Sequence, residues 1–225
     1  MPRPVPVVLV AVALAVATAG CSGSGSSEAV ARPEPTTTFT ADVPVLVPGA
    51  PGEPGEVVEP GESRSVPNAD YFGDGDVTFM SDMVVHHAQA LRMAELAPER
   101  ADSDQVRRLA ERISAAQGPE IAAMTAWLEA RGLPVPDVRQ AGHVEHGDMP
   151  GMATGEDMTR LAASEGSDFD RLFLELMIRH HGGALQMVDS AGAGAEHPQV
   201  VDAVSDTGVT QSVEIRRMQE LLDGM

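Results

Sequence analysis

The sequence predicts an all-α protein, an antiparallel four-helix bundle made from two copies of one helical hairpin. Aromatic residues are only 3% of the chain, and Ala, Leu, Met, Glu and Arg dominate after residue 75, as is typical of helical domains. The unusual stretch MVVHHAQALRM at 83–93 returns as MIRHHGGALQM at 177–187, which indicates an internal repeat. Gly/Pro-rich breaks divide each copy into two helices, and two hairpins with short turns close most simply as a bundle.

The repeat extends well beyond the histidine pairs. A shift of 94 residues aligns the two copies without a gap, from Phe79 on Phe173 to Leu128 on Leu222. So many matches without an insertion indicate that the folded domain is a duplication. Other matched positions are Gln117 with Gln211, Glu120 with Glu214 and Met124 with Met218.

Start and stop signals place the helices of the first copy. Asp76 or Thr78 is a candidate N-cap of a helix that runs to about residue 97, where Pro98 breaks it. Ser103 is the candidate N-cap of a second helix that continues toward Arg131 and is stopped by the glycine and proline that follow.

The second copy predicts helices at 167–191 and 198–223, separated by the turn GAGAEHP. In the first copy, Pro119 lies inside the expected second helix. Because proline removes a helical hydrogen bond, we expect a kink or a new turn there.

The N-terminal residues lie outside this domain. Residues 1–20 combine Arg3 with a short apolar run, which predicts a secretory signal peptide. The tetrad Thr-Ala-Gly-Cys ending at Cys21 is similar to a bacterial lipobox. We therefore expect Cys21 to be lipidated and the protein to be anchored to the outer face of the bacterial cell membrane. A signal that stays uncleaved would hold the domain at the same surface.

Composition then sets the domain boundaries. Residues 21–69 are rich in Ser, Gly, Pro and Glu, which predicts a lipidated cysteine followed by a disordered tether. The four-helix domain should occupy 70–225, with hairpins at 76–131 and 164–225 and a Met/His-rich connector at 132–163.

Charge and cysteine content narrow the function. The formal net charge of −19 argues against nucleic acid as a partner, because phosphates would be repelled. The same charge is compatible with attraction of cations. Cys21 is the only cysteine, so no disulfide can form within the chain, and stability must come from a core or a metal.

Helical periodicity places both histidines of each pair beside the apolar stripe. With about 100° per residue, His87 and His86 lie about 40° and 60° to either side of Met83. The repeat predicts the same placement for His180 and His181. The partner helices direct a glutamine and a glutamate of each copy toward the same interior, namely Gln117 with Glu120 and Gln211 with Glu214.

Two interpretations of these histidines are open. Because buried imidazoles need partners, each ring either hydrogen-bonds to a glutamate or glutamine and specifies packing, or binds a metal. In the first case the methionines are core filler. Duplicated histidine pairs with nearby thioethers favour the metal, and adjacent rings project about 100° apart, so one ion need not bind both. The bracketing methionines are Met83 and Met93 in the first copy and Met177 and Met187 in the second.

The connector supplies a second set of candidate ligands. HVEHGDMPGM is either an exposed polar loop with coincidental methionines or a further metal-binding segment. Thioethers are soft donors and imidazoles are borderline, a mixture that suits Cu(I), with Cu(II) using the nitrogens. Mg²⁺ and Ca²⁺ prefer oxygen, and zinc is rarely bound by methionine. Copper is therefore the expected metal. The candidates in this segment, spaced by three, are His143, His146, Met149 and Met152.

These motifs resemble a known family. The pattern F-x3-M-x2-HH-x2-AL-x-M, followed in each copy by Q-x2-EI-x2-M-x3-L, resembles the domain of unknown function 305 (DUF305), and HGDMPGM is similar to its Met-rich connector. The resemblance covers about residue 71 to the C-terminus. It implies an exported, ferritin-like four-helix bundle, and members implicated in copper binding implicate the paired histidines and bracketing methionines, with Glu120 and Glu214 beside them. Because Gly182-Gly183 replaces Ala88-Gln89, we expect the third helix to be looser there.

Three classes of function compete. The first, which we favour, is a lipid-anchored protein that captures copper outside the membrane to buffer it or to transfer it to a delivery partner. The second is a ferritin-like dimetal oxidase, which needs Glu-x-x-His on two helices. Met83 and Met177 stand where those glutamates would be, and Asp82 is replaced by Leu176 in the second copy. The third is a structural or interaction bundle without metal. We expect a binding protein rather than an enzyme.

Overall fold

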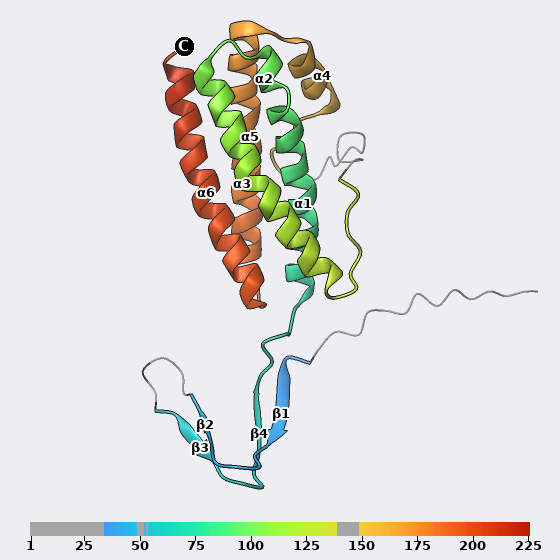
Figure 1. Ribbon diagram of the computed structural model, residues 1–225, viewed down its shortest axis with the longest axis vertical. Coiled ribbons are helices and arrows are strands. Elements are labelled where there is room, and N and C mark those ends of the chain that lie inside the picture. The colour runs from blue at the N-terminus through green and yellow to red at the C-terminus, as the bar shows by residue number, and fades with distance from the viewer. Residues whose placement is uncertain (1–33, 49–51, 53, 139–148) are drawn as a thin grey trace, which may run out of the picture.

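The helices of the computed structural model form the predicted bundle (Figure 1). The structure describes residues 34–48, 52, 54–138 and 149–225. The first hairpin consists of α1 (Asp74–Ala94) and α3 (Asp104–Glu129), with the single turn α2 (Ala97–Arg100) between them. The second consists of α5 (Gly166–Gly192) and α6 (Pro198–Asp223), preceded by α4 (Gly155–Ala163). The all-α, four-helix architecture is thus confirmed.

The helix ends differ from the predicted ones in two places. The N-cap of α1 is Gly73, and Asp76 lies at the third helical position, where its Oδ2 accepts a hydrogen bond from the Gly73 N–H at 2.8 Å. The prediction of Asp76 or Thr78 as N-cap is therefore wrong, because a carboxylate can cap a helix from inside its first turn. The second difference is at the other end of α1, which ends at Ala94 and not at about residue 97. Pro98 stands in the first turn of α2, where a missing N–H costs nothing.

The remaining long helices lie close to their predicted ranges. Ser103 caps α3 as expected, and its Oγ accepts from the Gln105 N–H at 3.2 Å. Through Pro119, α3 continues as one helix, so the expected new turn does not form. The expected loop connector contains α4, whose start is capped reciprocally by Thr154 and Asp157. The T-x-x-D spacing of that capping box was the available signal for this helix.

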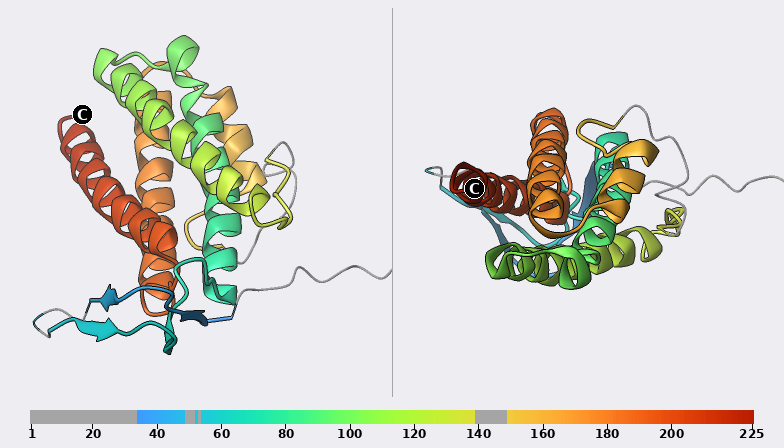
Figure 2. Two further views of the ribbon diagram at one scale, coloured as in Figure 1. Left: turned by 60° about the horizontal axis from the view of Figure 1, so that its bottom comes forward. Right: turned by 90° about the horizontal axis from the view of Figure 1, so that it is seen from above.

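The hairpins are joined through α1 and α5, which run antiparallel. Viewed along the bundle, α1 and α5 are neighbours, while α3 lies against α1 and α6 against α5 (Figure 2). At the start of α1, Asp76 Oδ1 accepts from the Glu196 N–H at 2.9 Å, in the turn before α6. One repeat later, Asp170 Oδ2 accepts from the Ser103 N–H at 2.8 Å, before α3. Each hairpin therefore supplies a buried carboxylate to the turn of the other.

A layer of buried polar side chains divides the apolar core in two. One apolar cluster lies where α3 and α5 begin and includes Leu109 and Phe173. The other lies where α1 and α6 begin and includes Phe79 and Leu128. Midway along all four long helices stand six polar side chains that are at most 1% exposed, and we call them the polar layer: His86, His87, Gln117, His180, His181 and Gln211.

The N-terminal segment corrects one prediction. Strands β1 (Thr36–Thr40) and β4 (Ser63–Pro67) pair antiparallel, as do β2 (Val45–Val47) and β3 (Glu56–Val58), so the described part of the expected disordered tether contains strands. They lie beyond the end of the bundle where α1 begins (Figure 1). Runs of β-branched Thr and Val favour strands even between prolines and glycines. The predicted signal peptide and Cys21 lie outside the described residues.

Among residues 34–48, 52, 54–138 and 149–225, no helix combines the length and apolarity needed to cross a membrane.

Replacing Asp76 with alanine is expected to lower the free energy of unfolding by about 1–3 kcal/mol. The substitution leaves the Gly73, Glu196 and His197 N–H groups without their shared acceptor in a buried place. Urea unfolding of the metal-free protein measures the change. The control is Asp168→Ala, an exposed acid in the first turn of α5, for which a loss of only a few tenths of a kcal/mol is expected. Equal losses in both variants would contradict the assigned role of Asp76.

Candidate metal site

The two histidine pairs meet in the middle of the bundle. All four rings are 0% exposed. His86 on α1 and His180 on α5 face each other, with ring centroids 3.9 Å apart and planes inclined by 39°. His180 and His181 are farther apart, at 6.2 Å between centroids. The duplication therefore brings one ring from each copy into direct contact across the antiparallel α1–α5 interface.

Three of these histidines hydrogen-bond to an oxygen through Nε2. His87 Nε2 lies 2.8 Å from Glu120 Oε2, and His181 Nε2 lies 2.6 Å from Glu214 Oε2. His86 Nε2 lies 3.1 Å from the carbonyl oxygen of Pro150. Carboxylate and carbonyl oxygens accept, so each Nε2 carries a proton, and in a neutral ring the lone pair is then on Nδ1.

The opposite nitrogens are buried without partners. Nδ1 of His86, His87 and His181 makes no hydrogen bond with the described residues, and His180 makes none through either nitrogen. The same holds for both amide atoms of Gln117 and for Oε1 of Gln211. Leaving a buried polar atom unpaired costs about 1–3 kcal/mol. A ligand that bound these nitrogens would recover that free energy.

The central pair is uncharged. Burial lowers the pKa of His86 to about 3, although the hydrogen bond to the Pro150 carbonyl acts in the opposite direction. Burial and the three neighbouring histidines place the pKa of His180 well below its ordinary value. Both rings are therefore neutral in the physiological range, which is the form that binds metals.

The predicted thioethers flank the polar layer on both sides. Met83 and Met187 belong to the apolar cluster at the start of α1, and Met93 and Met177 belong to the other cluster. Three of the four are 0% exposed, while Met187 is half-buried. Met83 precedes His86 by one helical turn, as Met177 precedes His180. The repeat thus places a buried sulfur-bearing side chain one turn from each ring of the central pair.

The described part of the connector reaches the same region. Met149 and Met152 are half-buried and pack against Val85 and Ala88 on α1, while the intervening Pro150 carbonyl accepts from His86. His143 and His146 lie outside the described residues. The connector therefore supplies an oxygen to the histidine layer, while its two methionines contact Val85 and Ala88. No sequence pattern pointed to that carbonyl.

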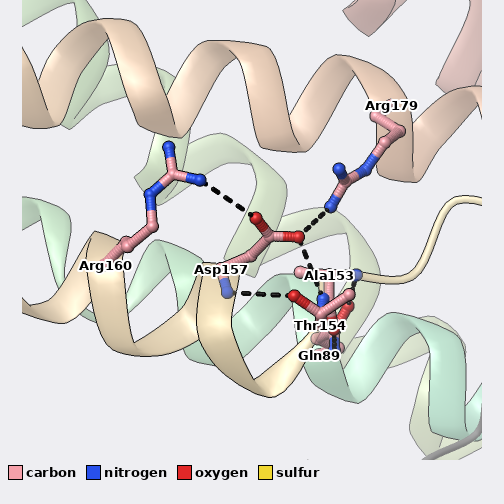
Figure 3. Close-up of polar contacts among 6 residues, drawn as sticks. All are labelled: Gln89, Ala153, Thr154, Asp157, Arg160 and Arg179. Carbon is pink, nitrogen blue, oxygen red and sulfur yellow. Dashed lines mark hydrogen bonds and ion pairs between the residues drawn. The ribbon is translucent and has the colours of Figure 1, made fainter.

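A polar latch holds the connector in place (Figure 3). Gln89 on α1 donates to the Ala153 carbonyl at 2.8 Å and accepts from its N–H at 2.7 Å. Asp157 on α4 accepts from Arg179 on α5 at 2.5 Å. Burial raises the pKa of Asp157, but its bonds to Arg179 and Thr154 outweigh burial and hold it below the ordinary value. The latch ties the connector to both inner helices.

Gly183 has a different role from the one expected. The repeat replaces Gln89 with Gly183, and a Cβ there would lie 1.9 Å from the Pro150 carbonyl oxygen and 2.7 Å from the Gly151 Cα. Gly151 has φ +76°, a conformation that favours glycine. The helix α5 is continuous through both glycines, and Gly183 is the surface on which the connector backbone rests.

The donor set fits a soft metal. Within the described ranges, no group of three or more His, Cys, Asp or Glu side chains could hold a metal ion. A site built on His86 and His180 would therefore be completed by other donors, and the thioethers one turn away are the ones that the fold supplies. Neutral imidazoles with thioethers suit Cu(I) better than zinc or a hard cation. The Pro150 carbonyl, which accepts from His86 Nε2–H, would hold that ring with its Nδ1 lone pair free for such an ion.

Fold and site together define a class of protein, a duplicated four-helix bundle with a buried histidine layer and flanking methionines. The model of DUF305, a domain of unknown function, matches residues 76–222, so the chain belongs to the DUF305 family. The resemblance predicted from the histidine motifs is confirmed. No curated protein matches the chain.

Solved structures agree with this assignment. A DUF305 fragment from Deinococcus radiodurans is 34% identical, with a TM-score of 0.62 over 68% of this chain and 99% of that one. A DUF305 protein from Streptomyces coelicolor, described as secreted, is 31% identical, with a TM-score of 0.59 over 67% and 93%. CopM in its Cu(II)-bound form is 31% identical, with a TM-score of 0.57 over 66% and 96%. CopM has also been solved in Cu(I)-bound and Ag-bound forms.

Substituting alanine for Gly183 is expected to displace the connector and lower the free energy of unfolding by about 1–3 kcal/mol, because the added methyl overlaps the Pro150 carbonyl. The matched control is Gly182→Ala, which meets nothing within 4 Å and should stabilise α5 by about 0.5–1 kcal/mol. Urea unfolding measures both variants. Stabilisation by both would mean that the connector does not rest on Gly183.

The His180→Leu variant should make the metal-free protein more stable by about 1–2 kcal/mol, because leucine removes two buried nitrogens that have no partner among the described residues. His181→Leu is the adjacent control. It strands Glu214 without its 2.6 Å partner and should be destabilising. Unfolding in the presence of a chelator compares the two. A clear loss of stability in His180→Leu would show that its nitrogens are satisfied in solution.

Proposed function

We propose that this protein is an exported copper-binding protein that holds Cu(I) between its paired histidines, with methionine thioethers as further ligands. The central site is assigned to His86 and His180, the rings in contact across α1 and α5. Met83 and Met177, one turn away, are the assigned sulfur donors. In this function the protein buffers copper outside the cytoplasm or transfers it to a partner.

The observation that carries this proposal is the orientation of the histidines. Three of them donate Nε2–H to an oxygen and direct an unpaired Nδ1 into the buried interior. Histidines that bind metals almost always hold their second nitrogen in this way, because the acceptor fixes the tautomer and raises the basicity of the ligand. Histidines that serve only packing need no free lone pair, since an unpaired buried nitrogen is destabilising.

The surroundings are also suited to a monovalent ion. Cu(I) held by neutral imidazoles keeps its positive charge. Glu120 and Glu214 are hydrogen-bonded to His87 and His181, the rings that neighbour the central pair in the sequence, and their negative charges would offset part of that charge. A dimetal oxidase would need a cage of carboxylates instead. The described residues contain no group of three carboxylate or histidine ligands, and the copper-bound and silver-bound CopM relatives favour the soft ion.

The predicted signal peptide and a relative support a location outside the cytoplasm. A DUF305 protein of similar sequence is described as secreted, in line with the signal peptide predicted at 1–20. We propose that Cys21 carries a lipid that anchors the chain to the outer face of the membrane. Residues 21–69 then separate the bundle from the lipid surface, and a copper-delivery partner would meet it there.

Anaerobic titration of the full chain with Cu(I), in competition with a chromogenic chelator, tests the proposal. We expect the wild type to retain at least one equivalent of Cu(I), and His86→Leu/His180→Leu to lose it with an affinity at least about 100-fold weaker. Glu120→Gln/Glu214→Gln should weaken binding about tenfold: the amide oxygens can still accept from His87 and His181, but the two negative charges next to the central pair are removed.

The control is His197→Asn. His197 is also buried, at 4% exposure, but Trp127, Arg131 and the Gln199 N–H contact its ring nitrogens, so it has no free position for a metal. Asparagine keeps its role as the N-cap of α6. Copper binding should be unchanged in this variant. Equal Cu(I) retention by the wild type and by His86→Leu/His180→Leu would refute the assigned site.

A further inference from the structure

A cleft between α3 and α6 opens next to the histidine layer. It encloses about 320 Å³ and brings side chains from α1, α3 and α6 together. Two of its lining residues, Met80 and Met124, are thioethers with only 3% exposure, and the single tryptophan, Trp127, lies beside them at 4% exposure. The exposed carboxylates of Asp202 and Asp206 belong to the same cleft.

One residue connects the cleft to the polar layer. Glu120 lines the cleft, and its Oε2 accepts the hydrogen bond from the buried His87 at 2.8 Å. The side chain of Glu120 remains 29% exposed, whereas His87 is fully buried. The cleft therefore contacts the polar layer through the Glu120–His87 pair.

The duplication did not preserve this arrangement in the second copy. The 94-residue shift places Leu174 where Met80 stands, and it places Arg108 and Arg112 opposite Asp202 and Asp206. Both arginines are exposed. The equivalent face at the other end of the bundle therefore carries two positive charges in place of two negative ones. It also carries an aliphatic side chain in place of the Met80 thioether. Cations are attracted to one face and repelled by the other.

We propose that the cleft is the loading site through which Cu(I) enters the protein. Asp202 and Asp206 raise the local concentration of cations, and the thioethers of Met80 and Met124 take the ion from its donor. The ion then passes beside Glu120 to the histidines. This inference rests on the proposed function, since the histidine layer is the destination. Each step exchanges one ligand for another, and copper remains Cu(I) throughout.

Thioethers select the ion that the carboxylates attract. The carboxylates alone would draw Zn²⁺ or Mg²⁺ as readily as copper, but methionine sulfur binds Cu(I) and Ag(I) far better than these harder cations. Neutral thioethers also leave the positive charge of the ion uncompensated, so it is held less tightly than by a thiolate and can move on to the imidazoles. The cleft is therefore suited to transient capture.

Trp127 is a built-in reporter of this step. Cu(I) or Ag(I) arriving beside the only tryptophan should quench its fluorescence, and anaerobic stopped-flow mixing with the full chain follows that signal. Met80→Leu/Met124→Leu conserves volume. It should lower the second-order loading rate at least tenfold while the copper bound at equilibrium stays the same. The control with two other thioethers changed is Met158→Leu/Met225→Leu, which should load at the wild-type rate.

Charge is tested separately. Asp202→Asn/Asp206→Asn should slow loading about three- to tenfold at low ionic strength, and the difference should shrink as salt is added. Asp189→Asn/Asp223→Asn removes the same charge from exposed positions outside the cleft and should have a much smaller effect. Zn²⁺ should not produce the rapid quenching at all.

The outcomes separate the two proposals. Wild-type loading rates in both cleft variants would overturn the loading site even if His86→Leu/His180→Leu loses its copper as expected. A loss of copper at equilibrium in Met80→Leu/Met124→Leu would make these thioethers permanent ligands and overturn a transient role. Undiminished tight binding in His86→Leu/His180→Leu would refute the histidine site, and loading of that site with it. Slower capture with unchanged capacity supports the cleft.

Discussion

The structure depends on a buried layer of imidazoles at the middle of a four-helix bundle. Apolar clusters lie above and below it, so each ring is removed from water. At least one nitrogen of every ring has no hydrogen-bond partner among the described residues. Such a layer destabilises the metal-free fold. Binding an ion to the free nitrogens would recover that free energy, which couples metal affinity to stability. The neutral state of His86, with a pKa of about 3, keeps its lone pair available across the physiological range.

The duplication explains why the layer can form at all. Because α1 and α5 are repeat-related and antiparallel, equivalent residues near their midpoints meet, and His86 contacts His180. Residues at the helix starts instead reach the far end of the other copy, where Asp76 and Asp170 hold the turns before α6 and α3. One set of residues, used twice, thus produces both the central site and the contacts that fix its geometry.

Departures from the repeat are as informative as the repeat itself. Gln89 binds the connector through two hydrogen bonds, whereas its counterpart Gly183 lets the connector backbone approach closely. The two positions therefore contact one connector in different ways. The α3–α6 cleft likewise carries Asp202 and Asp206 where the other copy has Arg108 and Arg112. The polar layer, which both copies supply, therefore lies beside a surface that differs between the copies.

The sequence by itself determined the duplication, the four long helices, the buried faces of the histidine pairs and the family. Helical periodicity and an ungapped repeat can be recognised from the order of residues alone, without knowledge of how the helices pack. It also indicated Glu120 and Glu214 as neighbours of the histidines. Only the tertiary structure decided which rings meet, which nitrogen each one leaves free, and that a Pro150 carbonyl orients His86. The strand pairs before α1 and the glycine contact at Gly183 were likewise decided there. These features arise from the antiparallel packing of distant segments, and the spacing of residues along one chain does not encode the direction in which two helices cross.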